Sequence, residues 1–153
     1  DSVLLMTYEW GYTYGPPMAV APVNKVRQVV EYAVTRIPPS RIDLGVPNYG
    51  YDWTLPFVRG SSRATTISNL EAVRIAVEAG VPIQFDEVAM SPYFQYEKDG
   101  QQHEVWFEDV RSYREKFSLL PEYGLRGMGY WQIMRFFRPN WLLLENTFQI
   151  QKP

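Results

Sequence analysis

The sequence predicts an α/β domain that carries a small antiparallel insertion. Three short apolar runs, each expected to form a strand, alternate with helix-like segments, which is the pattern of a parallel sheet with helices packed on it. Between the second and third runs the hydrophobic period changes towards two, and Asp99-Gly100 is typical of a hairpin turn. The chain of 153 residues, 46% of them hydrophobic, is long enough for one domain with its own core.

The first expected strand opens the chain and ends in polar and aromatic residues. Its unbroken apolar run, Val3 to Met6, predicts a strand covered on both faces. Tyr8 can form hydrogen bonds, Glu9 can carry a charge or a proton, and Trp10 can stack on a ligand. The carboxyl ends of parallel strands are where ligands bind, so a site is predicted here. The alternative is an ordinary strand end in a solvated loop.

A loop and a helix follow. The loop over 11–21 is rich in Gly, Pro and Tyr and is a candidate wall for a pocket. Pro22 stands in the first turn of a helix that is expected to run to about Ile37, and apolar residues three and four apart give it one buried stripe. This helix is predicted to be scaffold.

The second expected strand, Ile42 to Val46, ends in the same kind of residues. An amide, two hydroxyl-bearing rings and a carboxylate follow it: Asn48, Tyr49, Tyr51 and Asp52. Repetition of this chemistry at the next strand end strengthens the prediction of a site.

The insertion and the C-terminal part have recognisable boundaries. Ser68 and Glu71 form an expected capping box, and Gly80 is placed to end that helix. Asp109 is expected to cap a later helix, and Asn140 a short final one. The other predicted elements are an irregular loop over 54–67, a strand over 83–86, hairpin strands over 93–97 and 102–107, a helix over 109–123, a strand over 125–131 and a helix that includes 141–144.

Composition excludes several classes of function. The net charge of -2, without clusters of Lys or Arg, argues against a nucleic-acid partner, and no apolar stretch reaches the roughly 18 residues that span a bilayer. Cys is absent and His103 is the single His, so no metal or cofactor is expected. His103 is interpreted as structural, and Glu108-Asp109 as a helix-start pair. Aromatic residues make up 16% of the chain and suit the flat faces of sugar rings.

Three motifs resemble one known family. The segments 6–9, 45–50 and 127–131 resemble, in order and spacing, strands six, seven and eight of glycoside hydrolase family 18. That family contains chitinases and N-acetylglucosaminidases built on a (β/α)8 barrel. The segments 91–94 and 105–112 are most similar to its branch of spore-former enzymes that act on cortex peptidoglycan.

The resemblance implies an α/β fold that is the C-terminal part, strands six to eight, of a (β/α)8 TIM barrel with a small α+β insertion domain. The implied division is 1–53 for two barrel strands and their helix, 54–124 for the insertion, and 125–153 for strand eight and the last helix. The family's Asp-x-x-Asp-x-Asp-x-Glu motif, whose Glu is the general acid, does not occur here. We therefore expect the C-terminal portion of a longer protein that does not hydrolyse glycan by itself. Because half a barrel exposes two strand edges, the chain is expected to self-associate or to form a compact open-sheet variant.

The same resemblance implies residue roles in substrate-assisted retaining catalysis. Tyr8 matches the hydroxyl that orients the acetamido group, Trp131 matches the floor under the sugar, and Glu9 stands where many members have Asp. Weaker candidates are Asn48, Tyr49 and Asp52 for sugar hydroxyls, and Trp10 and Tyr51 for stacking.

The implied partner is an N-acetylglucosamine-containing oligo- or polysaccharide, either chitin or peptidoglycan, and the implied location is extracytoplasmic, in the cell wall or spore envelope. Two alternatives remain open at this point. One is a non-catalytic glycan-binding protein on the same scaffold, and the other is an unrelated α/β domain with aromatic loops.

Overall fold

A computed structural model describes residues 1–150 of the chain. Its first sheet contains three parallel strands in the order β1-β2-β8, with β1 at Val3–Leu5, β2 at Ile42–Pro47 and β8 at Gly127–Trp131. Leu5 pairs with Leu44, and Pro47 pairs with Trp131, so β2 is the central strand. All three strands lie where the apolar runs predicted them.

The second sheet is antiparallel, with strand order β4-β3-β7-β6-β5. The expected hairpin is confirmed, since β6 and β7 pair through Asp99 and Gly100. The prediction of an irregular loop over 54–67 was wrong in part, because that stretch contains β4. The strand bounds are β3 Gly50–Thr54, β4 Thr65–Ile67, β5 Gln84–Asp86, β6 Ser91–Lys98 and β7 Gln101–Trp106.

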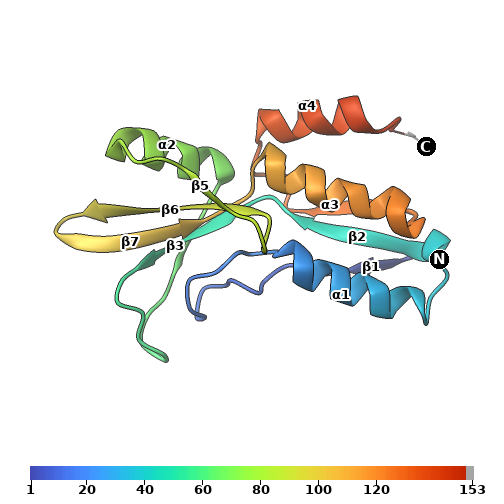
Figure 1. Ribbon diagram of the computed structural model, residues 1–153, viewed down its shortest axis with the longest axis horizontal. Coiled ribbons are helices and arrows are strands. Elements are labelled where there is room, and N and C mark those ends of the chain that lie inside the picture. The colour runs from blue at the N-terminus through green and yellow to red at the C-terminus, as the bar shows by residue number, and fades with distance from the viewer. Residues whose placement is uncertain (151–153) are drawn as a thin grey trace.

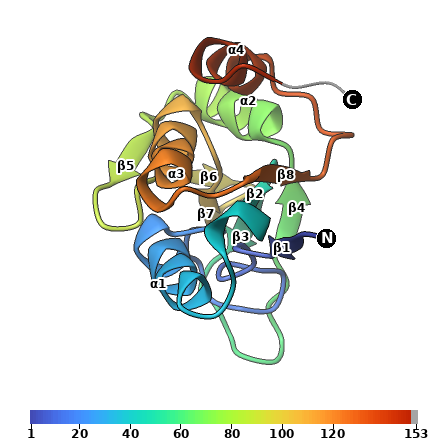
Figure 2. The ribbon, with the colours of Figure 1, turned by 90° about the vertical axis from the view of Figure 1, so that its right-hand side faces the viewer.

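Four α-helices and a short 3-10 turn complete the described residues. Figure 1 shows two halves side by side: α2 lies with the antiparallel sheet, and α1, α3 and α4 lie with the parallel sheet. Figure 2, which looks along the parallel strands, shows α1 and α3 together on one side of them. The bounds are α1 Val23–Val34, α2 Asn69–Ala79, α3 Val110–Tyr123 and α4 Arg138–Thr147, with the 3-10 turn at Pro39–Arg41.

The largest core cluster lies between the parallel sheet and these helices. Leu44 and Val46 of β2 are fully buried against Val30 of α1 and Tyr113 and Phe117 of α3. A second cluster joins the 11–21 loop to β3, and a third joins α2 to the outer face of β6 and β7. The helix that was predicted to be scaffold, α1, thus packs on one face of the parallel sheet.

The opposite face of the parallel sheet is open. The first strand was expected to be covered on both faces, and that prediction was wrong: Val3 is 42% exposed, Leu4 49% and Met6 74%. The reason is that β1 is an edge strand paired only with β2, while the helices pack on one face. Trp131 at the end of β8 is also 59% exposed. Self-association through this open face stays a prediction.

Two of the expected helix caps differ in detail. The Ser68 hydroxyl accepts from the Glu71 amide at 3.1 Å, but the Glu71 carboxylate pairs with Arg74, so only half of the capping box forms. Asn140 is not a cap, because α4 begins at Arg138 and Asn140 lies buried within its first turn. Its side-chain oxygen instead accepts a hydrogen bond from the Tyr130 hydroxyl at 3.1 Å.

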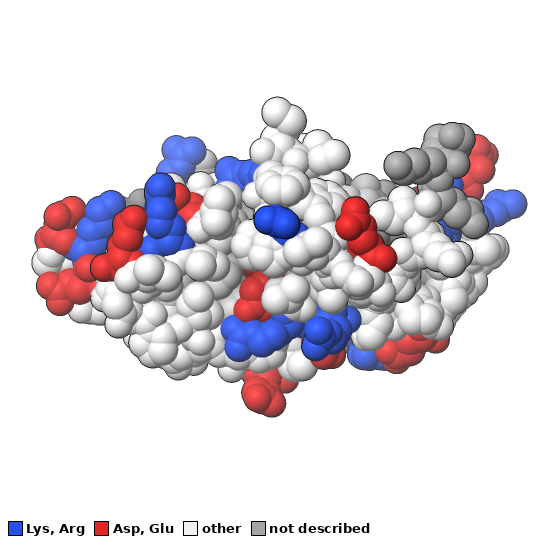
Figure 3. Space-filling model, turned by 90° about the horizontal axis from the view of Figure 1, so that it is seen from above, with Lys and Arg blue, Asp and Glu red and all other residues white. Residues whose placement is uncertain are grey.

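Charge is distributed without a large area of one sign on the face that α2 and α4 form. Figure 3 shows Lys and Arg interspersed with Asp and Glu there. Among residues 1–150, no helix is both long enough and apolar enough to cross a membrane.

Candidate functional site

The parallel strands bring their carboxyl ends to one edge of the sheet. Pro47 ends β2 beside Trp131, which ends β8, and Tyr8 and Glu9 follow β1 at the same edge. Tyr8, Glu9 and Trp131 therefore come to one edge of the sheet, although they lie far apart in the sequence.

Tyr8 and Trp131 lie on the open face of the sheet. A Cβ on Gly45 would stand 2.9 Å from Cε1 of Tyr8 and 2.3 Å from the Leu5 carbonyl, so only glycine lets the tyrosine ring lie over β2. Gly45 pairs with Gly129, and Trp131 follows two residues later on the same face. By sheet dimensions Trp131 is about 8 Å from Gly45.

Glu9 is held at the rim of this face by two tyrosines, one just before β3 and one in it. The Tyr49 hydroxyl donates to Oε1 of Glu9, and the Tyr51 hydroxyl lies 3.0 and 3.1 Å from its two carboxylate oxygens. Glu9 itself is exposed and has φ of 70°, in the left-handed region that non-glycine residues rarely occupy. Such a backbone outlier beside an aligned carboxylate is typical of a functional site.

The tyrosines of this cluster stay protonated. Burial, followed by the negative charge of Glu9, raises the pKa of Tyr8. Burial and the hydrogen bond to Glu9 raise the pKa of Tyr49, and burial is also the main cause of the raised pKa of Tyr51. All three hydroxyls therefore keep their proton at neutral pH: Tyr49 and Tyr51 direct theirs to Glu9, and that of Tyr8 is available to a ligand.

Asn48 is placed in the core behind the site. It is fully buried, and its Nδ2 donates to the carbonyls of Gln132, at 3.3 Å, and Arg135. Its Oδ1 accepts from the hydroxyl of Tyr113 at 3.2 Å and from Nδ2 of Asn69 at 3.4 Å. This network fixes the loop after Trp131 against the end of β2.

Asp52 points to the face of the antiparallel sheet opposite to that of Tyr51. Its Oδ1 lies 2.9 Å from Nδ1 of His103, and its Oδ2 accepts from the Tyr96 hydroxyl at 2.7 Å. Asp52 and His103 are each 13% exposed in their side chains. The structure therefore separates Asp52 from the Glu9 cluster, and it gives His103 a partner within the fold.

Trp10 also lies away from the other candidates. It packs towards α1, where it lines a hollow of about 520 Å³ with Lys25, Gln28, Val29 and Tyr32. Its backbone amide donates to the Val20 carbonyl at 3.1 Å, and this bond joins the two ends of the 11–21 loop.

Thr7 supports the site although the sequence pattern did not indicate it. It is 1% exposed, and its hydroxyl donates to the Gly45 carbonyl at 2.7 Å. This bond joins β1 to β2 just where the chain turns into Tyr8. The available signal was a polar residue directly after an apolar run, within the motif Met6 to Glu9.

No group of three His, Cys, Asp or Glu side chains within residues 1–150 is arranged to hold a metal ion. What the site offers is an exposed carboxylate, a half-buried tyrosine and an exposed tryptophan around one open face. Such a surface can bind the ring, the hydroxyls and the amide of an amino sugar.

Comparison with known proteins decides the family. Residues 1–135 match the family model of the glycosyl hydrolases family 18. The chain belongs to glycosyl hydrolase family 18. The family 18 resemblance of the three strand-end motifs is thus confirmed.

The relatives point to one branch of family 18. A cortical fragment-lytic enzyme of Bacillus subtilis is 48% identical over 153 residues, which cover 99% of this chain and 36% of that enzyme. A cortical fragment-lytic enzyme of Bacillus anthracis is 46% identical over the same number of residues, with the same coverage. The chain therefore spans about a third of the length of these curated relatives.

Solved structures agree with this assignment. The spore cortex-lytic enzyme SleL of Bacillus cereus superposes with a TM-score of 0.97 at 45% identity, over 100% of this chain and 36% of that one. A chitinase of Chromobacterium violaceum superposes with a TM-score of 0.88 at 28% identity, over 96% of this chain and 45% of that one. The mixed α/β fold is thus that of family 18 enzymes.

Proposed function

We propose that the chain forms strands six to eight and the α+β insertion of a (β/α)8 hydrolase that cleaves N-acetylglucosamine-containing peptidoglycan. In this proposal β1, β2 and β8 are the barrel strands, and the antiparallel sheet with α2 is the insertion. The parallel order β1-β2-β8, the insertion between β2 and β8 and the open sheet face support it. The similarity to cortical fragment-lytic enzymes supports peptidoglycan over chitin and an extracytoplasmic place in the cell wall or spore envelope.

The observation that carries the proposal is the arrangement of Tyr8 and Trp131 on one open face with Glu9 at its rim. In substrate-assisted retention, the carbonyl oxygen of the sugar's 2-acetamido group attacks the anomeric carbon while the glycosidic C–O bond breaks. The leaving oxygen takes a proton from a general acid, and water later opens the oxazolinium ring. This chemistry needs a donor that holds the acetamido oxygen in line and a flat floor under the ring.

Each residue has a role in this proposal. The Tyr8 hydroxyl, kept protonated by burial and by Glu9, donates to the acetamido oxygen. Trp131 packs under the sugar ring, and Glu9, with Tyr49 and Tyr51 on its carboxylate, contacts the sugar or its amide nitrogen. The 153 residues hold no Asp-x-x-Asp-x-Asp-x-Glu motif, so the general acid is supplied from outside them.

A chimera tests the proposal. The matching segment of the Bacillus subtilis cortical fragment-lytic enzyme is replaced by this chain, and hydrolysis of an N-acetylglucosamine oligomer and of cortex fragments is measured. The chimera should be active, and this chain alone should be inactive. Tyr8→Phe in the chimera should lower kcat about 100-fold, as loss of one aligned donor does. The control, Tyr32→Phe on the exposed surface of α1, should leave kcat unchanged.

Other outcomes would decide between this function and the alternative. A folded chimera that binds the oligomer without cleaving it would favour a glycan-binding protein without catalysis. Full activity of Tyr8→Phe would remove Tyr8 from the mechanism.

A further inference from the structure

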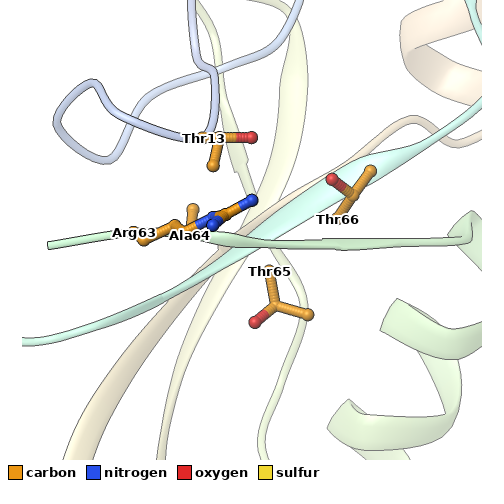
Figure 4. A pocket seen from close by; sticks show the side chains of 5 residues that line it. All are labelled: Thr13, Arg63, Ala64, Thr65 and Thr66. Atoms are coloured by element: carbon orange, nitrogen blue, oxygen red, sulfur yellow. The ribbon is translucent and has the colours of Figure 1, made fainter.

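A pocket of about 300 Å³ lies between the 11–21 loop and β4, outside the strand-end site. It is lined by Thr13 from the loop and by Arg63, Ala64, Thr65 and Thr66 from the strand side. Figure 4 shows Thr13 across from the Arg63 side chain, with Thr66 further along the same strand. The Ala64 amide donates to the Thr13 carbonyl at 2.8 Å, which fixes the two walls relative to each other.

The walls of this pocket carry positive charge alone. The segment 10–21 contains no charged residue, and the segment 55–67 contains two, Arg59 and Arg63, and no Asp or Glu. Arg63 lies over the ring of Tyr14, with its guanidinium carbon 5.5 Å from the ring centre. Within residues 1–150 Arg63 forms no ion pair, so its charge is not neutralised by the fold. A guanidinium near the hydroxyls of Thr13 and Thr66 is suited to a carboxylate.

The pocket adjoins the Glu9 cluster. Tyr51 pairs directly with Thr66 across β3 and β4, so the side chains of these two residues lie on the same face of the antiparallel sheet. The Tyr51 hydroxyl lies 3.0 Å from Glu9. Tyr51 therefore links the Glu9 cluster to the wall of the pocket at Thr66.

We propose that this pocket, defined by Thr13, Arg63 and Thr66, binds a carboxylate on the glycan next to the sugar held at the strand ends. The inference rests on the proposed function and deepens it. Chitin is neutral throughout, whereas peptidoglycan carries a lactyl ether on every second sugar. Its carboxylate is either free or extended by a peptide that bears further carboxylates. The pocket thus selects peptidoglycan over chitin.

Binding measurements on this chain test the proposal. Calorimetry compares three glycans of equal length: a chitin tetramer, a tetramer with free lactyl groups, and the same tetramer with peptide stems. The wild-type chain should bind at least one carboxylate-bearing glycan more tightly than the chitin tetramer. Arg63→Gln should weaken that binding roughly five-fold to ten-fold and leave chitin binding unchanged. Arg63→Lys should restore part of the preference, and raised salt should reduce it.

Arg59→Gln is the matched control, because it removes the same charge from the same segment without lining the pocket. The free-lactyl and peptide-bearing glycans separate the two sources of the carboxylate. Equal loss for all three glycans in Arg63→Gln, or an equal effect of Arg59→Gln, would overturn the carboxylate site. Chitin binding with no preference for the charged glycans would refute this site and leave the proposed function standing. An inactive chimera would count against the proposed function itself.

Discussion

Replacement of Lys116 by Met should strongly destabilise the fold. Nζ of Lys116 donates to Oε2 of Glu108 at 2.9 Å, and the two side chains are 1% and 0% exposed. Within residues 1–150, Oε1 of Glu108 has no hydrogen-bond partner. Loss of one member of such a buried pair leaves an uncompensated charge and costs about 3–5 kcal/mol. Since domains are stable by roughly 5–15 kcal/mol, this is a large part of the total.

The destabilisation should depend on pH. Burial raises the pKa of Glu108 more than Lys116 lowers it. In Lys116→Met the lowering contribution is gone, so the folded pKa of Glu108 lies further above the unfolded one. Stability is then fully present below the unfolded pKa and is lost as pH rises through the folded pKa. The variant should lose more free energy of unfolding at roughly pH 8 than at roughly pH 5.

Urea unfolding followed by tryptophan fluorescence measures these effects. The double variant Glu108→Leu/Lys116→Met should recover most of the loss, because it removes both charges and keeps apolar volume. Lys25→Met on the exposed side of α1 is the control and should change stability by less than about 0.5 kcal/mol. A loss below about 1 kcal/mol in Lys116→Met, or a double variant as unstable as the sum of the singles, would refute the buried-pair reasoning.

Two further variants test the framework of the site. Asn48→Ala should cost about 2 kcal/mol in urea unfolding, because it leaves the buried Tyr113 hydroxyl and carbonyls of the loop after β8 with fewer partners. The exposed Asn146→Ala should cost far less, and equal losses would contradict this view of Asn48. Ser68→Ala should cost about 1 kcal/mol of unfolding free energy, because the Glu71 amide loses its cap. Ser68→Asp should retain the cap, and a thermal unfolding midpoint as low as that of Ser68→Ala would argue against it.

Local sequence patterns predicted most of the elements, because each has a strong local cause. The run from Ile42 to Val46 formed a buried strand, and Gly80 ends its helix with positive φ as expected. Asp109 caps α3, because its side chain accepts hydrogen bonds from the backbone amides of Arg111 and Ser112. These features depend on neighbours within a few residues, so the sequence alone carries them.

Elements that depend on distant partners were missed. β4 is three residues long, and it is a strand because it pairs with β3 across a long loop. The exposure of β1 follows from its place at the sheet edge, which no pattern within Val3 to Met6 could indicate. Asn140 is a residue type that often caps helices. Its side-chain oxygen instead accepts a hydrogen bond from the Tyr130 hydroxyl, ten residues earlier in the chain.

The candidate site shows the same division. The strand-end positions of Tyr8, Glu9 and Trp131 were predictable, since parallel strands deliver their ends to one edge. The partners of the side chains were not. Asn48 and Asp52 follow the second parallel strand and have polar side chains that could bind a sugar. Within the fold, however, Asn48 accepts a hydrogen bond from the Tyr113 hydroxyl, and Asp52 is paired with His103.

The Glu9 cluster connects the antiparallel sheet to the ends of the parallel strands. Glu9 follows the first parallel strand, while Tyr49 and Tyr51, which hold its carboxylate, lie 40 and 42 residues later at the start of the antiparallel sheet. Tyr51 is in turn set by its pairing with Trp106 and Thr66. A change in the register of β3 in the antiparallel sheet would therefore move the donors on Glu9. The Glu9 carboxylate can thus be aligned only when both sheets have folded.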